Sequence, residues 1–262
     1  TLPPNDIHDN TTGLRLWSGG EAQFNRIHGN ATGIDAQNNT DVHHNVLYRN
    51  TEQAVLVDGH HDVAIENNTV YAPLGHGVRV RGGGYDVALQ NNIIWTDSGY
   101  GIFVDTNSQQ GFESDYNDLF STGGGQLVWW QKPFADLFDW QVEAGLDEHS
   151  IGSTVPDPTL DNPQFVNLAG DDYHLSSGST SIDAGHPSSL FANEPSPDGE
   201  RINLGAYGDT VDASPSPMQY LQIDYPNYYT DWPNTEGRPI LWRTYDSTAG
   251  TLSGNVDIDL VD

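Results

Sequence analysis

Charged side chains recur at similar intervals in the middle of the sequence, in the order Asp58, Arg81 and Asp105. Two carboxyl groups on either side of a glycosidic bond can act as a general acid and a general base. An arginine between them can hold a uronate carboxylate through a bidentate contact. The opposing interpretation is a surface Asp-Arg-Asp ladder, in which the arginine relieves the repulsion between two stacked carboxylates.

A second group of side chains lies close to these positions in the sequence and could support proton abstraction from a uronic acid. Such chemistry needs a cation to neutralise the substrate carboxylate, a base, and a donor to the leaving oxygen. Arg79 and Arg81 can supply the cation, while His76 and Tyr100 can act as the base or the donor. Histidine and tyrosine are common in loops, so the group is a hypothesis about a site.

Aromatic and imidazole side chains also recur along the sequence, once every 20 to 25 residues. Their flat faces could stack on sugar rings, with polar edges binding hydroxyl groups. The alternative is an aromatic stack that shields the strands without any ligand, beneath the C-terminal part of the chain. The residues in this line are His8, His28, Tyr48, Tyr71, Trp95 and Phe120.

The elements that would position these side chains are short strands in a repeat. Six hexapeptides begin with Asn and carry an aliphatic residue at the third position, at intervals of about 20 to 25 residues that are typical of a solenoid. The asparagines are Asn5, Asn25, Asn45, Asn68, Asn92 and Asn117, and the aliphatic residues are Ile7, Ile27, Leu47, Val70, Ile94 and Leu119.

Each repeat contains two further short strands. Segments such as DVAIENN precede the asparagine and segments such as GVRV follow the hexapeptide, and both alternate apolar with polar residues. Three strands per repeat without helical periodicity predict one coil of a parallel β-helix. Because coils stack about 4.8 Å apart, the asparagines are expected to form a ladder of side-chain amides, and Asn67 with Asn91 a second one.

Stacked coils would place the outward residues of the G-I-x-V strand in two columns. Two coils separate Asp58 from Asp105 by about 9.6 Å, near the upper end of the roughly 6.5 to 9.5 Å range of inverting glycoside hydrolases. The first column holds Arg15, Asp35, Leu56, Arg79 and Phe103, and the second Trp17, Gln37, Asp58, Arg81, Asp105 and Trp129.

The pattern N-N-x-I-x-x-N followed by G-I-x-V, over residues 5 to about 130, resembles the right-handed parallel β-helix repeat family. That family includes pectate lyases, polygalacturonases, alginate epimerases and bacterial surface proteins. The resemblance implies an all-β, right-handed parallel β-helix with three strands per coil, an Asn ladder and a C-terminal β extension. It further implies a secreted or cell-surface protein that acts on polysaccharide along an outer sheet, as a lyase, an epimerase or an inverting hydrolase. The alternative is a noncatalytic carbohydrate-binding, adhesin or structural surface module.

Composition argues against several partners. Asp and Glu number 37 against 9 Lys and Arg, for a formal net charge of −28, which disfavours nucleic acid and anionic membrane surfaces. Without a long apolar run, membrane insertion is not expected. Without cysteine, neither a disulfide nor a thiolate metal site can form. The acidic excess also fits adaptation to salt, because carboxylates stay hydrated.

Histidines and acidic loops are the two sources of metal ligands in this sequence. Adjacent residues of a strand face opposite sides, so neither His43–His44 nor His60–His61 is expected to chelate one ion. His44 aligns with inward positions and is expected in the core. Loops rich in Asp, Asn and Gly favour Ca²⁺, although no EF-hand loop is present.

The C-terminal half departs from the repeat. The segment FADLFDWQVEAG predicts a short helix capped by Gly145 and packed on the solenoid wall. Residues 157–187 and 196–209, here called the closing segment, are similar to the last coils of bacterial β-helix proteins. We expect the β-helix and its closing segment to span residues 1–212, and residues 213–218 to form a linker.

Residues 219–262 are expected to form a partial β-sandwich or a packed β segment, with strands at PILWRTY and VDIDLVD. A bare solenoid end exposes apolar core and unpaired backbone. We therefore expect earlier coils or a cap before Thr1, and a further domain or more of this one beyond Asp262.

Overall fold

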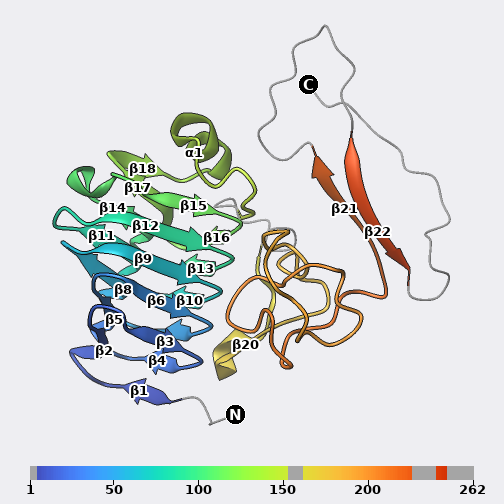
Figure 1. The fold of residues 1–262 in the computed structure, drawn as a ribbon, viewed down its shortest axis with the longest axis horizontal. Coiled ribbons are helices and arrows are strands. Elements are labelled where there is room, and N and C mark those ends of the chain that lie inside the picture. Colours follow the sequence, from blue (N-terminus) through green and yellow to red (C-terminus); the bar gives the residue numbers. More distant parts are fainter. Residues whose placement is uncertain (1–4, 153–161, 226–239, 247–262) are drawn as a thin grey trace, which may run out of the picture.

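The computed structural model describes residues 5–152, 162–225 and 240–246 (Figure 1). Three parallel sheets wrap around one core in the order expected of a parallel β-helix with three strands per coil, which confirms the predicted fold. From β1 to β17, consecutive strands along the chain belong to different sheets, so each full coil contributes one strand to each sheet.

We number the sheets by their place in the repeat. Sheet 1 contains the hexapeptide strands, sheet 2 the G-I-x-V strands and sheet 3 the strands that precede the asparagine. Sheet 1 comprises β1 (Asp6–His8), β4 (Arg26–His28), β7 (Val46–Tyr48), β10 (Thr69–Ala72), β13 (Ile93–Thr96) and β16 (Asp118–Ser121). Sheet 2 comprises β2 (Thr12–Leu16), β5 (Thr32–Ala36), β8 (Gln53–Asp58), β11 (His76–Arg81), β14 (Tyr100–Val104), β17 (Gln126–Trp130) and the antiparallel β18 (Lys132–Phe134). Sheet 3 comprises β3 (Glu21–Gln23), β6 (Thr40–His43), β9 (His61–Glu66), β12 (Tyr85–Gln90) and β15 (Glu113–Asp115).

The period-two alternation explains the core. Because successive strand residues point to opposite faces, the aliphatic position of each strand faces inward and stacks on its equivalent in the next coil. Ile27, Leu47 and Val70 of sheet 1 are at most 1% exposed and join the inward residues of the other two sheets in one apolar cluster.

The asparagine ladder is confirmed along the whole repeat. Each side-chain amide donates to the amide oxygen of the next, from Asn5 to Asn117, over distances of 2.8 to 3.1 Å. The second ladder is present too, since Asn91 donates to Asn67 at 3.3 Å. A third ladder, which the hexapeptide's last asparagine could have predicted, joins Asn10, Asn30 and Asn50.

The tight turn before sheet 1 depends on the residue that precedes each ladder asparagine. Five such residues have φ between 50° and 58°, in the left-handed region, so the chain turns there and strand alternation is interrupted. Asparagine tolerates this conformation well, but only two of the five are asparagine. The five residues are Phe24, His44, Asn67, Asn91 and Tyr116.

A short helix closes one end of the β-helix. Helix α1 (Leu137–Ala144) begins at Asp136, whose side chain accepts from the Asp139 N–H, and ends at Gly145 with φ of 65°, as predicted. It does not lie on the wall as expected, because Leu137 and Trp140 join the apolar core above β17 and β18 (Figure 1). The ladder ends here, where buried Asp147 accepts from Asn117 at 3.1 Å and from Trp140 Nε1 at 2.9 Å.

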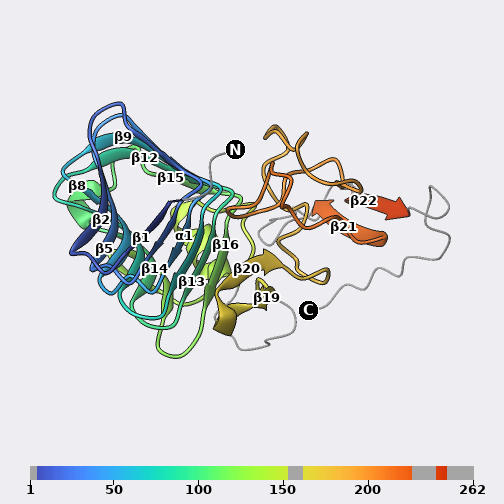
Figure 2. The same ribbon diagram turned by 90° about the horizontal axis from the view of Figure 1, so that it is seen from below.

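The closing segment lies along the outer face of sheet 1 and does not form the last coils (Figure 2). Its β19 (Phe165–Asn167), η2 (Leu168–Gly170) and β20 (Asp172–Leu175) make a small antiparallel hairpin instead of joining the three sheets. The closing segment packs here because the aromatic line of sheet 1 offers an apolar surface. Tyr173 is fully buried, and its ring centroid lies 5.2 Å from that of Tyr48.

The remaining described strands are β21 (Gln219–Tyr225) and β22 (Leu241–Asp246), which form an antiparallel pair. β22 overlaps the predicted PILWRTY strand and ends one residue beyond it, whereas VDIDLVD is outside the described residues. Arg243 of β22 donates to the Asp183 carbonyl at 3.0 Å, which ties the pair to the closing segment. Between them, Ala213 and Ser216 are buried, so residues 213–218 pack more closely than a free linker would.

Candidate functional site

The outer face of sheet 2 changes character halfway along its first column. The register runs from Asp35 to Leu56, Arg79, Phe103 and then Trp129. Arg15 and Asp35 form an ion pair of 2.7 Å at the start of the column. From Leu56 onward the column has no carboxylate, so Arg79 stands between two apolar neighbours.

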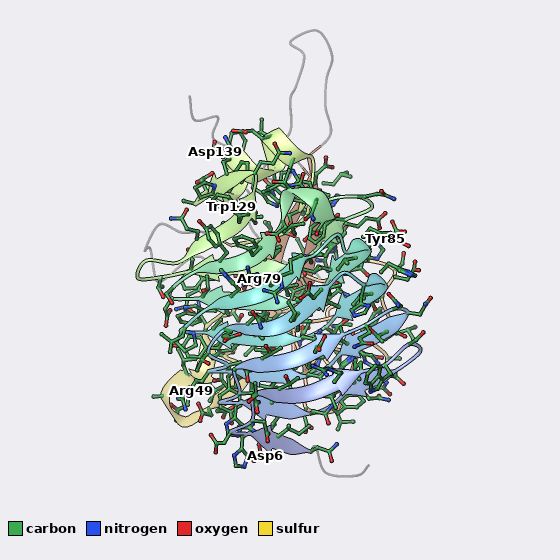
Figure 3. All side chains as sticks on the ribbon, turned by 90° about the vertical axis from the view of Figure 1, so that its left-hand side faces the viewer. Asp6, Arg49, Arg79, Tyr85, Trp129 and Asp139 are labelled. Carbon is green, nitrogen blue, oxygen red and sulfur yellow. The ribbon has the colours of Figure 1, made fainter. Side chains whose placement is uncertain are left out.

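Five partly exposed side chains around this arginine form what we call the Arg79 surface: His76, Arg79, Tyr100, Phe103 and Trp129. The rings of Phe103 and Trp129 lie parallel, with centroids 5.6 Å apart and planes 6° from one another. The Arg79 guanidinium lies 5.1 Å from the Phe103 centroid, within cation–π distance. Arg79 and Trp129 project from the same face of the β-helix (Figure 3).

Tyr100 and His76 border these rings. The Tyr100 ring lies 5.4 Å from Phe103 and 5.6 Å from Trp129, edge to face in each case. The His76 ring lies 4.9 Å from Phe103 and 5.8 Å from Tyr100. His76 and Tyr100, which were expected in loops, are instead the first residues of β11 and β14, and they meet the outward residues of these strands on one patch.

Arg79 differs from the other arginines of this face in its partners. Arg15 pairs with Asp35, and Arg81 pairs with Asp58 at 2.9 Å. Within the described part of the chain, no carboxylate lies at ion-pair distance from Arg79, and its Nε is buried without a hydrogen-bond partner. A buried donor without a partner is costly, and the terminal nitrogens of the same guanidinium can bind an anionic ligand at the surface.

His76 is held as a neutral hydrogen-bond donor. Burial, and secondarily the charge of Arg79, lower the pKa of His76 to about 4. Its Nδ1 accepts the Tyr100 backbone N–H at 3.2 Å, so the remaining proton sits on Nε2. Of the two roles that the sequence offered for His76, this tautomer supports donation to a ligand oxygen and leaves no free nitrogen lone pair for a base.

The second column keeps only part of its predicted composition. Asp58 and Arg81 are in register and ion-paired, as the surface-ladder interpretation requires. Asp105 follows the last residue of β14 and is the N-cap of η1 (Thr106–Ser108). Among the described residues, no ion pair joins Asp105 to Arg81. Trp129 was assigned to this column but is in register with Phe103 of the first one, and Trp17 stands apart at 68% exposure.

The aromatic line of sheet 1 is mostly covered and does not present a sugar-stacking surface here. Tyr48, Trp95 and Phe120 are at most 9% exposed, and Tyr71 is partly buried. Tyr173 and Phe165 of the closing segment pack on Tyr48 and Trp95, respectively. The structure thus favours the alternative of a shielding stack beneath the C-terminal part of the chain, and His8 and His28 stack on each other at its end.

The adjacent histidines do not follow the predicted alternation. His44 is not in the core: it lies partly exposed in the turn after β6, and its left-handed φ of 54° brings its ring to that of His43. Their Nδ1 atoms are 2.8 Å apart. In the parts of the chain that the structure describes, no three His, Asp or Glu side chains converge as a metal cluster, and no helix could span a membrane.

Sequence reasoning identified Arg79, His76 and Tyr100 but missed Phe103 as the centre of the surface. The column register already placed Phe103 next to Arg79, and that signal could have found it. Trp129 was misplaced because the glycine-rich turn at residues 123–125 hides the register of β17.

Comparison with known proteins gives one match. A family model described as a right-handed beta helix region matches residues 2–135, which include all three sheets from β1 to β18. No curated protein and no solved structure matches the chain.

Proposed function

The chain belongs to the right-handed β-helix family, and from this premise we propose that it binds a uronate-containing extracellular polysaccharide on the Arg79 surface. The observation that carries the proposal is Arg79 itself. It is a cation between apolar neighbours, with an unsatisfied Nε and without a carboxylate partner among the described residues. In a chain of formal net charge −28, an arginine left unneutralised is best explained by an anionic ligand.

The aromatic residues support a sugar ligand over a simple anion. The parallel Phe103 and Trp129 rings form a step beside the guanidinium, and flat apolar faces match the C–H faces of pyranose rings. His76 Nε2–H and the Tyr100 hydroxyl add donors for sugar hydroxyl groups. A uronate would therefore place its carboxylate on Arg79 and its ring over the aromatic pair.

Binding is better supported than turnover. His76 lacks a free basic nitrogen in the tautomer that its Tyr100 contact implies, and Asp58 is already paired with Arg81. The catalytic proposal, in which Asp58 and Asp105 act as acid and base or Arg79 and Arg81 support a lyase or epimerase, remains the alternative. A secreted or cell-surface location follows from the proposed ligand and is part of the same proposal.

The test is a panel of acidic and neutral polysaccharides, with polygalacturonate and alginate as the acidic members. Binding is followed by calorimetry, cleavage by new reducing ends, and elimination by the ultraviolet absorbance of an unsaturated uronate. The proposal expects binding to an acidic member without cleavage. Turnover that disappears in Asp58→Asn or Asp105→Asn with the fold retained would establish the catalytic alternative. Preference for neutral glucans, or binding to none of the panel, would contradict the proposal.

A further inference from the structure

The outer face of sheet 3 carries a second arrangement, remote in sequence from the Arg79 surface. His43 is the last residue of β6 and His44 follows it in the left-handed conformation. This single residue interrupts the alternation of side chains, so that both rings come together at the surface. The two Nδ1 atoms are 2.8 Å apart and the ring planes are nearly perpendicular, at 86°.

The partners of the outer nitrogens fix where the protons lie. His43 Nε2 is 2.6 Å from Glu21 Oε1, and His44 Nε2 is 3.0 Å from the Gly208 carbonyl oxygen. A carboxylate and a carbonyl only accept hydrogen bonds, so both Nε2 atoms carry a proton. The two Nδ1 atoms therefore face each other at 2.8 Å, a contact that requires one proton between them.

This pattern of outer partners is the one that metal-binding histidines use. A histidine that ligates a metal through one nitrogen almost always donates its other N–H to a carboxylate, a backbone carbonyl or water. Here His43 has the carboxylate of Glu21 and His44 has the carbonyl of Gly208. The outer partners thus orient both rings with their Nδ1 atoms toward a common point.

We propose that His43 and His44 bind one divalent transition-metal ion through their Nδ1 atoms, in place of the proton that they share, and that Cu²⁺ is preferred. Two nitrogens at about 2.0 Å from a metal and about 2.8 Å apart subtend roughly 90° at the ion, whereas a tetrahedral ion would need them about 3.3 Å apart. An angle near 90° is that of tetragonal Cu²⁺ or Ni²⁺ sites, and Cu²⁺ binds most tightly in the divalent series.

The surface beside the His43–His44 pair has acidic residues and an open groove that can admit a cation. A groove opens beside the pair, and its lining adds the carboxylates of Asp41 and Glu66 to the two rings. His43 and Glu66 are in register on neighbouring strands, β6 and β9. Since the described residues hold no cluster of three ligand side chains, water would fill the remaining positions, and the site would be weaker than structural metal sites with three or four protein ligands.

The proposal is independent of polysaccharide binding, and its test uses the whole chain. Cu²⁺ is titrated by calorimetry in several buffers of different ionisation enthalpy, and the loaded protein is examined by electron paramagnetic resonance. We expect one ion per chain, release of about one proton, and nitrogen hyperfine coupling from two imidazoles. His43→Gln and His44→Asn, the second chosen because Asn tolerates the left-handed backbone, should each weaken binding at least about tenfold.

The matched control is the other adjacent pair, His60 and His61. Their Nδ1 atoms bond to Asn38 and Asp62 rather than to each other, so His60→Gln and His61→Asn should leave the affinity unchanged. Circular dichroism verifies the fold of each variant, and His43→Gln decides the matter if His44→Asn unfolds, because His43 is partly exposed. Absence of a Cu²⁺ site, or equal loss in the two pairs of variants, would overturn the proposal.

Discussion

At the scale of single residues, the structure separates side chains that stabilise the fold from those that remain available for a ligand. The asparagines of the main ladder, from Asn5 to Asn117, use their amides within the chain, and Arg15 and Arg81 are neutralised by aspartates. Arg79 and the His43–His44 pair are different, because Arg79 has no carboxylate partner among the described residues and the two histidines bond to each other. These residues are therefore the ones that we propose bind a ligand.

A buried carboxyl in the closing segment provides a prediction about pH. Glu194 accepts backbone N–H bonds from Asn203 and Asp209, and burial raises the pKa of Glu194 to about 7. The folded state then holds a proton that the unfolded state releases above its ordinary pKa. Stability from this group is fully present below about pH 4.5 and is lost as pH rises through about 7.

We expect Glu194→Gln to flatten this dependence, since the amide oxygen still accepts both N–H bonds and never ionises. Between pH 5 and pH 8 the wild type should lose on the order of 3 kcal/mol relative to the variant. Denaturant unfolding at several pH values measures the difference. A gap between the two proteins that does not change with pH would contradict the assignment.

At the scale of elements, each coil depends on the asparagine ladder at the turn before its sheet 1 strand. Asn68 is fully buried; it accepts from the Asn45 amide and donates to Asn92 and to two backbone carbonyls. Replacing it leaves several buried donors and acceptors without partners, each costing about 1 to 3 kcal/mol. Asn10 belongs to another ladder and is exposed, so water can replace its bonds.

Asn68→Ala is therefore expected to destabilise the chain by about 3 kcal/mol or more, and Asn10→Ala by less than about 1 kcal/mol. Urea unfolding of the two variants, followed by circular dichroism, tests both numbers together. Similar losses in both would mean that the ladder contributes no more inside the solenoid than at its edge.

The elements also mark how far the sequence alone could predict the structure. Asn-x-aliphatic hexapeptides and alternating strands predict coils, sheets and ladder because these depend on local spacing. The packing of the closing segment on sheet 1 could not be read in this way, since it depends on contacts such as Tyr173 with Tyr48 across the fold. The histidine pair was misread because one left-handed residue, His44, overrides strand alternation.

The candidate site was predicted in part for the same reason. Arg79, Phe103 and their column follow from strand register, which is fixed once the coils are aligned. The protonation state of His76 could not be predicted from the sequence, because it depends on a hydrogen bond from the Tyr100 backbone and on burial. Sequence spacing predicts where side chains project, whereas their charge state is set by partners from other coils.

At the scale of the whole molecule, charge is the dominant property. A formal net charge of −28 creates repulsion within the folded chain, and added salt screens it. We expect the thermal midpoint to rise by about 2 to 4 °C, or about 1 kcal/mol, between 0.05 and 0.5 M NaCl. Thermal unfolding in NaCl, and in CaCl₂ at equal ionic strength, measures this. A midpoint that rises only with Ca²⁺ would indicate a specific ion site in place of general screening.

The measurement that most directly tests the proposed function compares two arginines of one column. Arg79 and Arg15 both project from sheet 2, but Arg15 is already paired with Asp35. Calorimetric titration with galacturonate and mannuronate–guluronate oligomers should show that Arg79→Gln weakens binding about tenfold or more, about 1.4 kcal/mol. Arg15→Gln should leave the affinity within about twofold. Equal effects of the two substitutions, or an unchanged affinity in Arg79→Gln, would contradict binding at the Arg79 surface.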